Sequence, residues 1–152
     1  MATNIYYTSN SDDRAREQVE TVTASSTLSS GDSGKIYLVA TDALTVTLPP
    51  VGSLGLGASS DAAPAGTTYT FVNSGADGNN IITISPAAAD GINGTITLAA
   101  SVVELSGVVN KDLINTKSTA TTGNSVTLVS TGTTGTGAWV VTFSTGIWAS
   151  EA

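Results

Sequence analysis

Short apolar runs alternate with turn residues along the chain from Gly34 onward, a spacing typical of all-β proteins. Within most runs apolar and polar residues alternate with period two, so each strand would bury one face and expose the other. Threonine fills many polar positions, because its branched Cβ suits extended backbone while its hydroxyl meets water. The run Ile36–Val39 is more continuously apolar, which predicts a central strand covered on both faces. Six further runs predict strands: 44–48, 67–72, 81–85, 95–98, 125–128 and 139–143.

Turn residues separate these runs. Pro49-Pro50 ends one strand, since neither residue has the backbone N–H that a sheet requires. Asn-Gly is the strongest short signal for a hairpin, and the stretch Thr131–Gly137 between two predicted strands is expected at a hairpin tip. Residues 34–152 are therefore predicted to form one all-β domain. Three pairs tolerate positive φ and predict turns: Asp77-Gly78, Asp90-Gly91 and Asn93-Gly94.

The first 33 residues differ from the rest and are predicted to form an N-terminal arm. Residues 11–18 could form a short helix capped by Ser11, but only Ala15 and Val19 would supply an apolar stripe, so that helix would be marginal in isolation. An apolar cluster at 5–7 has no local partner. Two interpretations are open: an arm that orders against another surface, or an edge strand of the domain's own sheet. The residues expected to bind a partner are Ile5, Tyr6, Tyr7, Asp12, Arg14 and Arg16.

Composition excludes most catalytic chemistry. The 152 residues fit one domain, and the chain contains neither cysteine nor histidine. Disulfides, Cys/His zinc sites and histidine-dependent nucleophiles are thereby excluded. Charged residues make up only 11% of the chain, and Ser and Thr close to three residues in ten. No apolar run reaches the ~20 residues of a membrane span, and the N-terminus lacks a signal-peptide pattern. The sequence predicts a protein that is not an enzyme, with no cofactor, metal or membrane partner.

The charge balance argues against nucleic acid as a partner. The formal net charge is −7, with five basic and twelve acidic residues. DNA binding depends on several cationic side chains that neutralise phosphates, and here the cations are few and scattered. A packed genome would repel an acidic protein. Any role in a nucleoprotein assembly is therefore expected on the outside of the shell that encloses the genome.

Several residues have two possible interpretations. Asp77–Asn80 and Asp90–Asn93 bring oxygen ligands together as calcium requires, but neither extends to an EF-hand loop. Asp-Gly and Asn-Gly turns explain the same residues without a metal. Trp139 and Trp148 could stack on sugar, but a place in the core is favoured for both. Trp139 alternates in step with Val141 and Phe143, which indicates the core. Glu104 interrupts an apolar run, which indicates an outward-facing edge position. The valine pairs 102–103 and 108–109 are compatible with either a core or a seam between subunits.

Seven segments between residues 34 and 148 carry a family resemblance: Gly34–Ala40, Thr45–Pro49, Gly66–Asn73, Ile81–Pro86, Val109–Thr116, Gly137–Val141 and Gly146–Trp148. Their order resembles that of the small decoration, or cement, proteins of tailed-bacteriophage capsids, including cyanophage-type virion proteins. Tail-fibre and baseplate modules have similar patterns. The resemblance implies a single antiparallel β-sandwich, jelly-roll-like, or a small barrel, with the extended N-terminal arm.

The resemblance also implies a function. It implies a homotrimer, made in the host cytoplasm, that binds the major capsid protein on the outer surface of the virion and stabilises the icosahedral head. The alternative is a tail or fibre module, or a lectin-like module that recognises glycan on the host surface. An exposed Trp148 or Tyr37 in a groove would favour the glycan module, whereas buried tryptophans and flat apolar patches would favour assembly.

Overall fold

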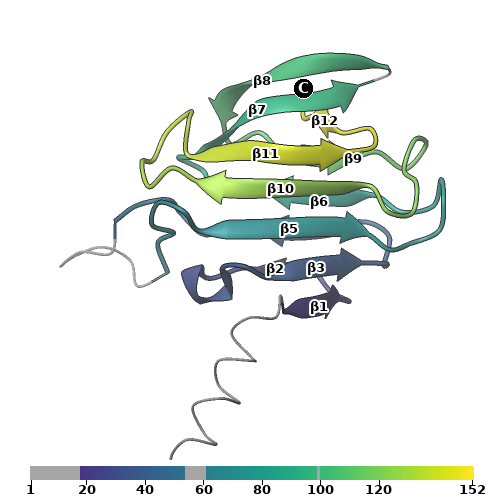
Figure 1. The fold of residues 1–152 in the computed structure, drawn as a ribbon, viewed down its shortest axis with the longest axis horizontal. Coiled ribbons are helices and arrows are strands. Elements are labelled where there is room, and N and C mark those ends of the chain that lie inside the picture. Colours follow the sequence, from purple (N-terminus) through teal and green to yellow (C-terminus); the bar gives the residue numbers. More distant parts are fainter. Residues whose placement is uncertain (1–17, 54–60, 99) are drawn as a thin grey trace, which may run out of the picture.

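The computed structural model describes residues 18–53, 61–98 and 100–152. Over these residues the protein is all-β, as predicted, with two mixed sheets and one short 3-10 helix, η1 (Ser30–Asp32) (Figure 1). The larger sheet has seven strands, in spatial order β1 (Val19–Val22), β3 (Ile36–Val39), β5 (Thr68–Asn73), β10 (Ser125–Ser130), β11 (Trp139–Thr145), β7 (Gly91–Leu98) and β8 (Ser101–Val109). The smaller sheet has five, in the order β12 (Ala149–Ser150), β9 (Leu113–Asn115), β6 (Ile82–Ser85), β4 (Leu44–Thr47) and β2 (Ser26–Thr27).

The first six strands alternate between the two sheets. Each odd-numbered strand joins the larger sheet and each even-numbered strand joins the smaller one. Each time the chain returns to a sheet, the new strand pairs in parallel with the previous strand of that sheet. The turns are unequal in length: Val19 pairs with Ile36, whereas Ile36 pairs with Thr70, twice as far along the chain. The winding is not visible as a repeat in the sequence, because successive circuits of the chain contain different numbers of residues.

The later strands close the sheets mainly with antiparallel pairs. These are β5–β10, β10–β11, β7–β8, β6–β9 and β9–β12, whereas β7 and β11 are parallel. The predicted hairpin at Thr131–Gly137 is confirmed, since it joins β10 to β11. The expectation of a purely antiparallel domain is wrong, and the physical reason is the winding: strands that return to a sheet after crossing to the other run in the same direction.

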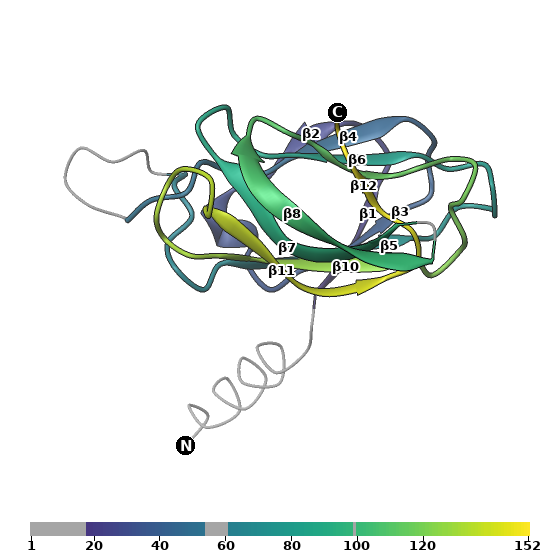
Figure 2. The same ribbon diagram turned by 90° about the horizontal axis from the view of Figure 1, so that it is seen from above.

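The two sheets face each other across one hydrophobic core. Figure 2 shows β4 and β6 along one side of the molecule and β5, β10 and β11 along the other. The core draws side chains from both sheets, and the largest of those that are fully buried are Trp139, Trp148, Tyr37, Tyr69, Phe71, Leu48, Ile82, Ile84, Leu113 and Leu128. In β4 and β6 the predicted alternation is confirmed: the aliphatic side chains are buried, and the threonine and serine side chains between them are half-buried.

The boundary of the predicted arm at residue 33 does not match the structure. Two strands within residues 19–33 belong to the sheets: β1 pairs with β3, β2 pairs with β4, and Val22 and Leu28 are buried in the core. Burial of these two aliphatic side chains favours docking of the segment on its own domain. β1 is therefore an edge strand of the larger sheet, whereas both interpretations of the segment before it stay open, because residues 1–17 lie outside the described residues. The possible helix at 11–18 lies outside the described residues, except for Gln18.

Two local predictions are corrected. Asn93-Gly94 is not a hairpin turn but lies inside β7, where Gly94 has a φ of 119° and approaches Val141 too closely for a side chain. Ile36–Val39 is not covered on both faces. Its side chains alternate between half-buried and buried, since β3 lies between β1 and β5 with one face toward the core.

Candidate functional site

The outer face of the larger sheet is the first candidate surface. Strand register aligns two rows of outward-facing residues across β1, β3, β5, β10 and β11, and none of them carries a charge: Val19, Ile36, Thr70, Thr127 and Phe143 in one row, Thr21, Leu38, Val72, Ser125 and Thr145 in the other. The hydroxyls of Thr70 and Thr127 are hydrogen-bonded at 2.9 Å. Short, branched side chains lose little rotamer entropy when a surface docks on them. We call these ten residues the uncharged face.

Phe143 is the most unexpected member of this face. The alternation predicts it in the core with Trp139 and Val141, and those two are buried, but Phe143 is 56% exposed. Thr127 pairs with Phe143 and the next residue, Leu128, pairs with Val141, so Thr142 is an extra residue in β11. A β-bulge of this kind reverses the alternation beyond it. It therefore turns an aromatic ring to solvent.

Beneath this face lies a cluster of aromatic side chains. The Tyr37 ring stacks on Phe71 at 5.5 Å between centroids, and Tyr69 packs against Trp139 at 5.5 Å. Trp139 and Trp148 are both fully buried, as predicted for Trp139 and favoured for Trp148. Both tryptophans of the chain therefore belong to the core, and neither offers a ring for sugar to stack on.

The two buried tyrosines differ at their hydroxyls. Tyr69 donates a hydrogen bond to the Ser29 carbonyl at 2.6 Å, whereas the Tyr37 hydroxyl is buried without a hydrogen-bond partner. Burial raises the pKa of Tyr37 to about 12, and burial also raises the pKa of Tyr69. Both phenols stay neutral in the folded protein because their ionised forms would be poorly solvated.

The second candidate surface is the free edge of the larger sheet, at β8. Among the described residues, this nine-residue strand has a neighbour, β7, on one side only. It exposes apolar side chains along its length: Val102 is 75% exposed, and Val108 and Val109 are exposed as well. The valine pairs whose burial the sequence left open therefore lie mainly at the surface. Glu104 is exposed on the same strand, which confirms its predicted edge position.

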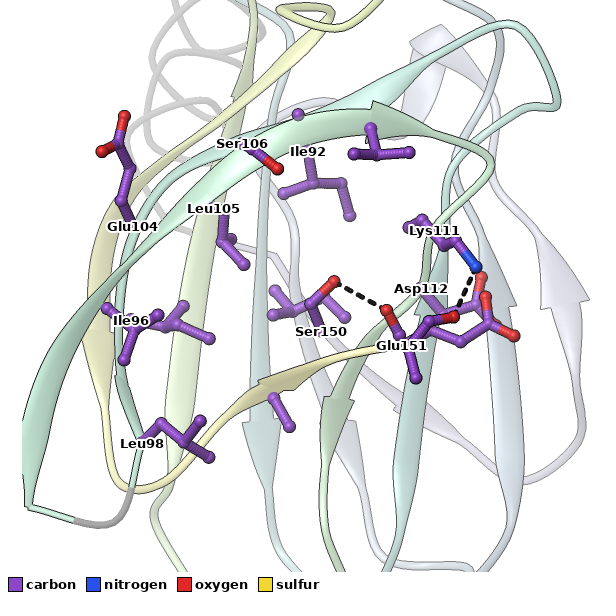
Figure 3. A pocket seen from close by; sticks show the side chains of 16 residues that line it. Ile92, Ile96, Leu98, Glu104, Leu105, Ser106, Lys111, Asp112, Ser150 and Glu151 are labelled. Atoms are coloured by element: carbon purple, nitrogen blue, oxygen red, sulfur yellow. Dashed lines mark hydrogen bonds between the residues drawn. The ribbon is translucent and has the colours of Figure 1, made fainter.

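A cavity of about 310 Å³ opens beside β8, where the two sheets end at β8 and β12. Figure 3 shows apolar side chains in it and polar groups toward one end. Its apolar lining includes Ile92, Ile96, Leu98, Val103, Leu105 and Leu113. We call this cavity the β8 pocket.

Three of the four charged residues around the β8 pocket, Lys111, Asp112 and Glu151, lie together at one end of it (Figure 3). Lys111 donates a hydrogen bond to the Ala152 carbonyl at 2.5 Å, beside Asp112 and Glu151. Glu104 lies on the other side of the pocket and points away from it (Figure 3). The floor is apolar, so the pocket is suited to holding apolar side chains rather than to polarising a reacting bond.

The two acidic turns that could have bound calcium are occupied by the protein itself. Asp90 is fully buried, and its carboxylate accepts hydrogen bonds from the Val51 amide (2.7 Å), the Thr134 hydroxyl (2.6 Å) and the Gly135 amide (3.3 Å). Asp77 accepts one from the Thr122 amide at 2.7 Å. Within the part of the chain that the structure describes, no three acidic side chains are grouped to hold a metal ion.

The lysines in the described ranges are engaged in local contacts. Lys35 bridges Asp32 (2.7 Å) and Glu20 (3.0 Å), and Lys117 pairs with Asp42. The hydrogen bond from Lys35 lowers the pKa of Asp32, and the same bond, followed by that to Glu20, raises the pKa of Lys35. Such exposed pairs contribute little to stability.

The residues predicted to bind a partner, at positions 5–7, 12, 14 and 16, lie outside the described residues. In the described ranges, no helix is long and apolar enough to cross a lipid bilayer. The exposure of Phe143 and Val19 could not be predicted from the sequence, since the alternation that identifies core positions does not reveal a bulge or an edge. For the β8 edge a signal was available, because its doubled valines break the period-two pattern.

Comparison with known proteins does not identify a family for this chain. No protein-family model matches the chain, and none of the curated proteins matches it significantly.

Proposed function

We propose that this protein is a non-enzymatic virion component that binds the outer surface of a major capsid protein and stabilises an icosahedral head. The observation that carries the proposal is the uncharged face, a broad pleated surface of aliphatic, aromatic and hydroxyl groups. In this proposal the two facing sheets form a rigid β-sandwich, and the chain acts as a homotrimer. The family resemblance of the segments between residues 34 and 148 supports the same assignment.

Attachment to a shell would use many weak contacts. Each copy would bury an uncharged surface that has little rotamer entropy to lose. One oligomer would bridge several shell subunits, and the effective concentration of the second and third contacts would make the whole attachment strong. The net charge of −7 favours the outer side of the shell, away from the packed genome.

The glycan-binding alternative has less support. Its expected platform was an exposed Trp148 or Tyr37, and both side chains are buried. A tail or fibre location would use the same uncharged face. The two locations are therefore distinguished by whether the protein binds shells or isolated tails.

The test is co-sedimentation of the full chain with expanded and unexpanded shells of the major capsid protein encoded by the same genome. We expect binding to shells, and weaker binding of Phe143→Lys by tenfold or more, about 1.4 kcal/mol, because an unpaired ammonium would be desolvated in the contact. Thr45→Lys, on the outer face of the smaller sheet, is the matched control and should bind normally. Binding to neither shell form, or binding to isolated tails instead, would contradict the head assignment.

A further inference from the structure

The β8 edge and the β8 pocket together have the form of a site for an added strand. β8 has one unpaired side, and the apolar pocket lies directly beside it, between the ends of the two sheets. A bulge at Gly107 and Val108, which both lie opposite Ile92, limits regular pairing to 101–106. An extended segment can add to such an edge through main-chain hydrogen bonds and place alternate side chains in the pocket.

We propose that the occupant is residues 3–8 of a neighbouring copy of this chain, with Ile5 and Tyr7 in the β8 pocket. These two side chains are two positions apart, so in an extended segment they lie on the same face. Residues 1–10 contain no acidic side chain, and they can therefore approach the pocket without repulsion from Asp112, Glu151 and Glu104.

Reach favours a neighbouring copy over the chain's own arm. The described chain begins at Gln18, next to β1, and β1 and β8 are the two opposite edges of the seven-stranded sheet. Six strand spacings separate those edges, about 29 Å. The chain from Tyr7 to Gln18 spans at most about 40 Å when fully extended. Its own segment would have to run almost straight across the sheet, with little length left to turn into the pocket.

Donation of residues 3–8 to a neighbouring copy would determine how the copies assemble. The donated segment and the pocket are different surfaces, so the contact is head-to-tail, and head-to-tail contacts that close form rings. A ring of three copies would satisfy every pocket and would match the proposed trimer. The inference concerns contact between free copies and requires no shell, so its failure would leave the proposed binding to a capsid shell standing.

Cysteine cross-linking tests the contact directly, because the chain has no cysteine of its own. Two single variants, Tyr7→Cys and Val108→Cys, are co-expressed with a mass tag on one of them and then oxidised. We expect a disulfide-linked band that contains both variants. The control replaces Val108→Cys by Phe143→Cys, which is also exposed but lies on the uncharged face. Equal cross-linking with both partners, or none with Val108→Cys, would overturn the proposal.

Light scattering gives a second readout. The unmodified chain should have the mass of an oligomer, and the double variant Ile5→Asp, Tyr7→Asp should have the mass of a monomer with an unchanged far-ultraviolet circular dichroism spectrum. A monomeric unmodified chain, an oligomer that survives both substitutions, or a disulfide that forms only within one chain carrying both Tyr7→Cys and Val108→Cys would each contradict it.

Discussion

At the scale of residues, the core distinguishes two tyrosines that the sequence treats alike. Tyr37 and Tyr69 occupy the same kind of inward-facing position, in β3 and β5, and their rings lie 6.3 Å apart. Only Tyr69 finds an acceptor for its hydroxyl, the carbonyl of Ser29. A buried polar group without a partner carries its full desolvation cost, so the two hydroxyls should have opposite effects on stability.

We therefore expect Tyr37→Phe to leave the free energy of unfolding unchanged or to raise it by up to about 1 kcal/mol, and Tyr69→Phe to lower it by about 1 kcal/mol. Chemical denaturation at neutral pH measures both. A larger loss for Tyr37→Phe than for Tyr69→Phe would contradict the hydrogen-bond assignment.

The raised pKa of Tyr37 predicts that the folded protein loses stability at alkaline pH. The pKa of Tyr37 is raised to about 12 in the folded protein, above the value of about 10 in an unfolded chain. The fold therefore binds the phenolic proton more tightly than the unfolded chain does. Its contribution is fully present below pH ~10 and is lost as the pH rises through about 12. Denaturation at several alkaline pH values should show this slope, and Tyr37→Phe should reduce it.

At the scale of elements, the β7–β8 hairpin is fixed by close backbone contacts. Gly107 has a φ of 69°, and a Cβ built there would lie 2.0 Å from the Thr136 carbonyl oxygen in the loop between β10 and β11. Only glycine allows the two backbones to approach so closely. The bulge of β8, the β8 pocket and the β10–β11 loop therefore depend on one another.

Gly107→Ala should lower the free energy of unfolding by about 3 kcal/mol or more, because the added methyl group meets backbone that cannot move aside cheaply. Gly34→Ala is the matched control: Gly34 also has a positive φ, 87°, but a Cβ there meets nothing within 4 Å, so the cost should be about 1 kcal/mol from backbone conformation alone. Thermal melts of the two variants measure the difference. Equal destabilisation would show that the close approach is unimportant.

At the scale of the whole molecule, the winding of the chain determines where the domain begins. β1 and β2 complete one edge of each sheet, and Val22 and Leu28 seal that end of the core. The described core begins at Val22. Deletions from the N-terminus should therefore have two distinct effects.

Deletion of residues 1–11 should leave the far-ultraviolet circular dichroism spectrum unchanged and weaken attachment to shells. Deletion of residues 1–28 should lower the melting temperature strongly, since it removes two strands and two buried side chains, each contributing about 1.5–3 kcal/mol. Circular dichroism and co-sedimentation measure the two effects. If the shorter deletion decorates shells as tightly as the full chain does, the first eleven residues are not needed for attachment.

The sequence by itself determined the all-β class, the burial of Trp139 and the hairpin at Thr131–Gly137. These follow from local alternation and from turn residues, which act over a few positions. The tertiary structure decided the mixed sheets, the place of β1 and β2 within them and the exposure of Phe143. Strand partners as far apart in the chain as Thr68 and Val129, and one inserted residue in β11, have no local signature. Pairing across the fold, rather than local pattern, therefore created the uncharged face and the open β8 edge.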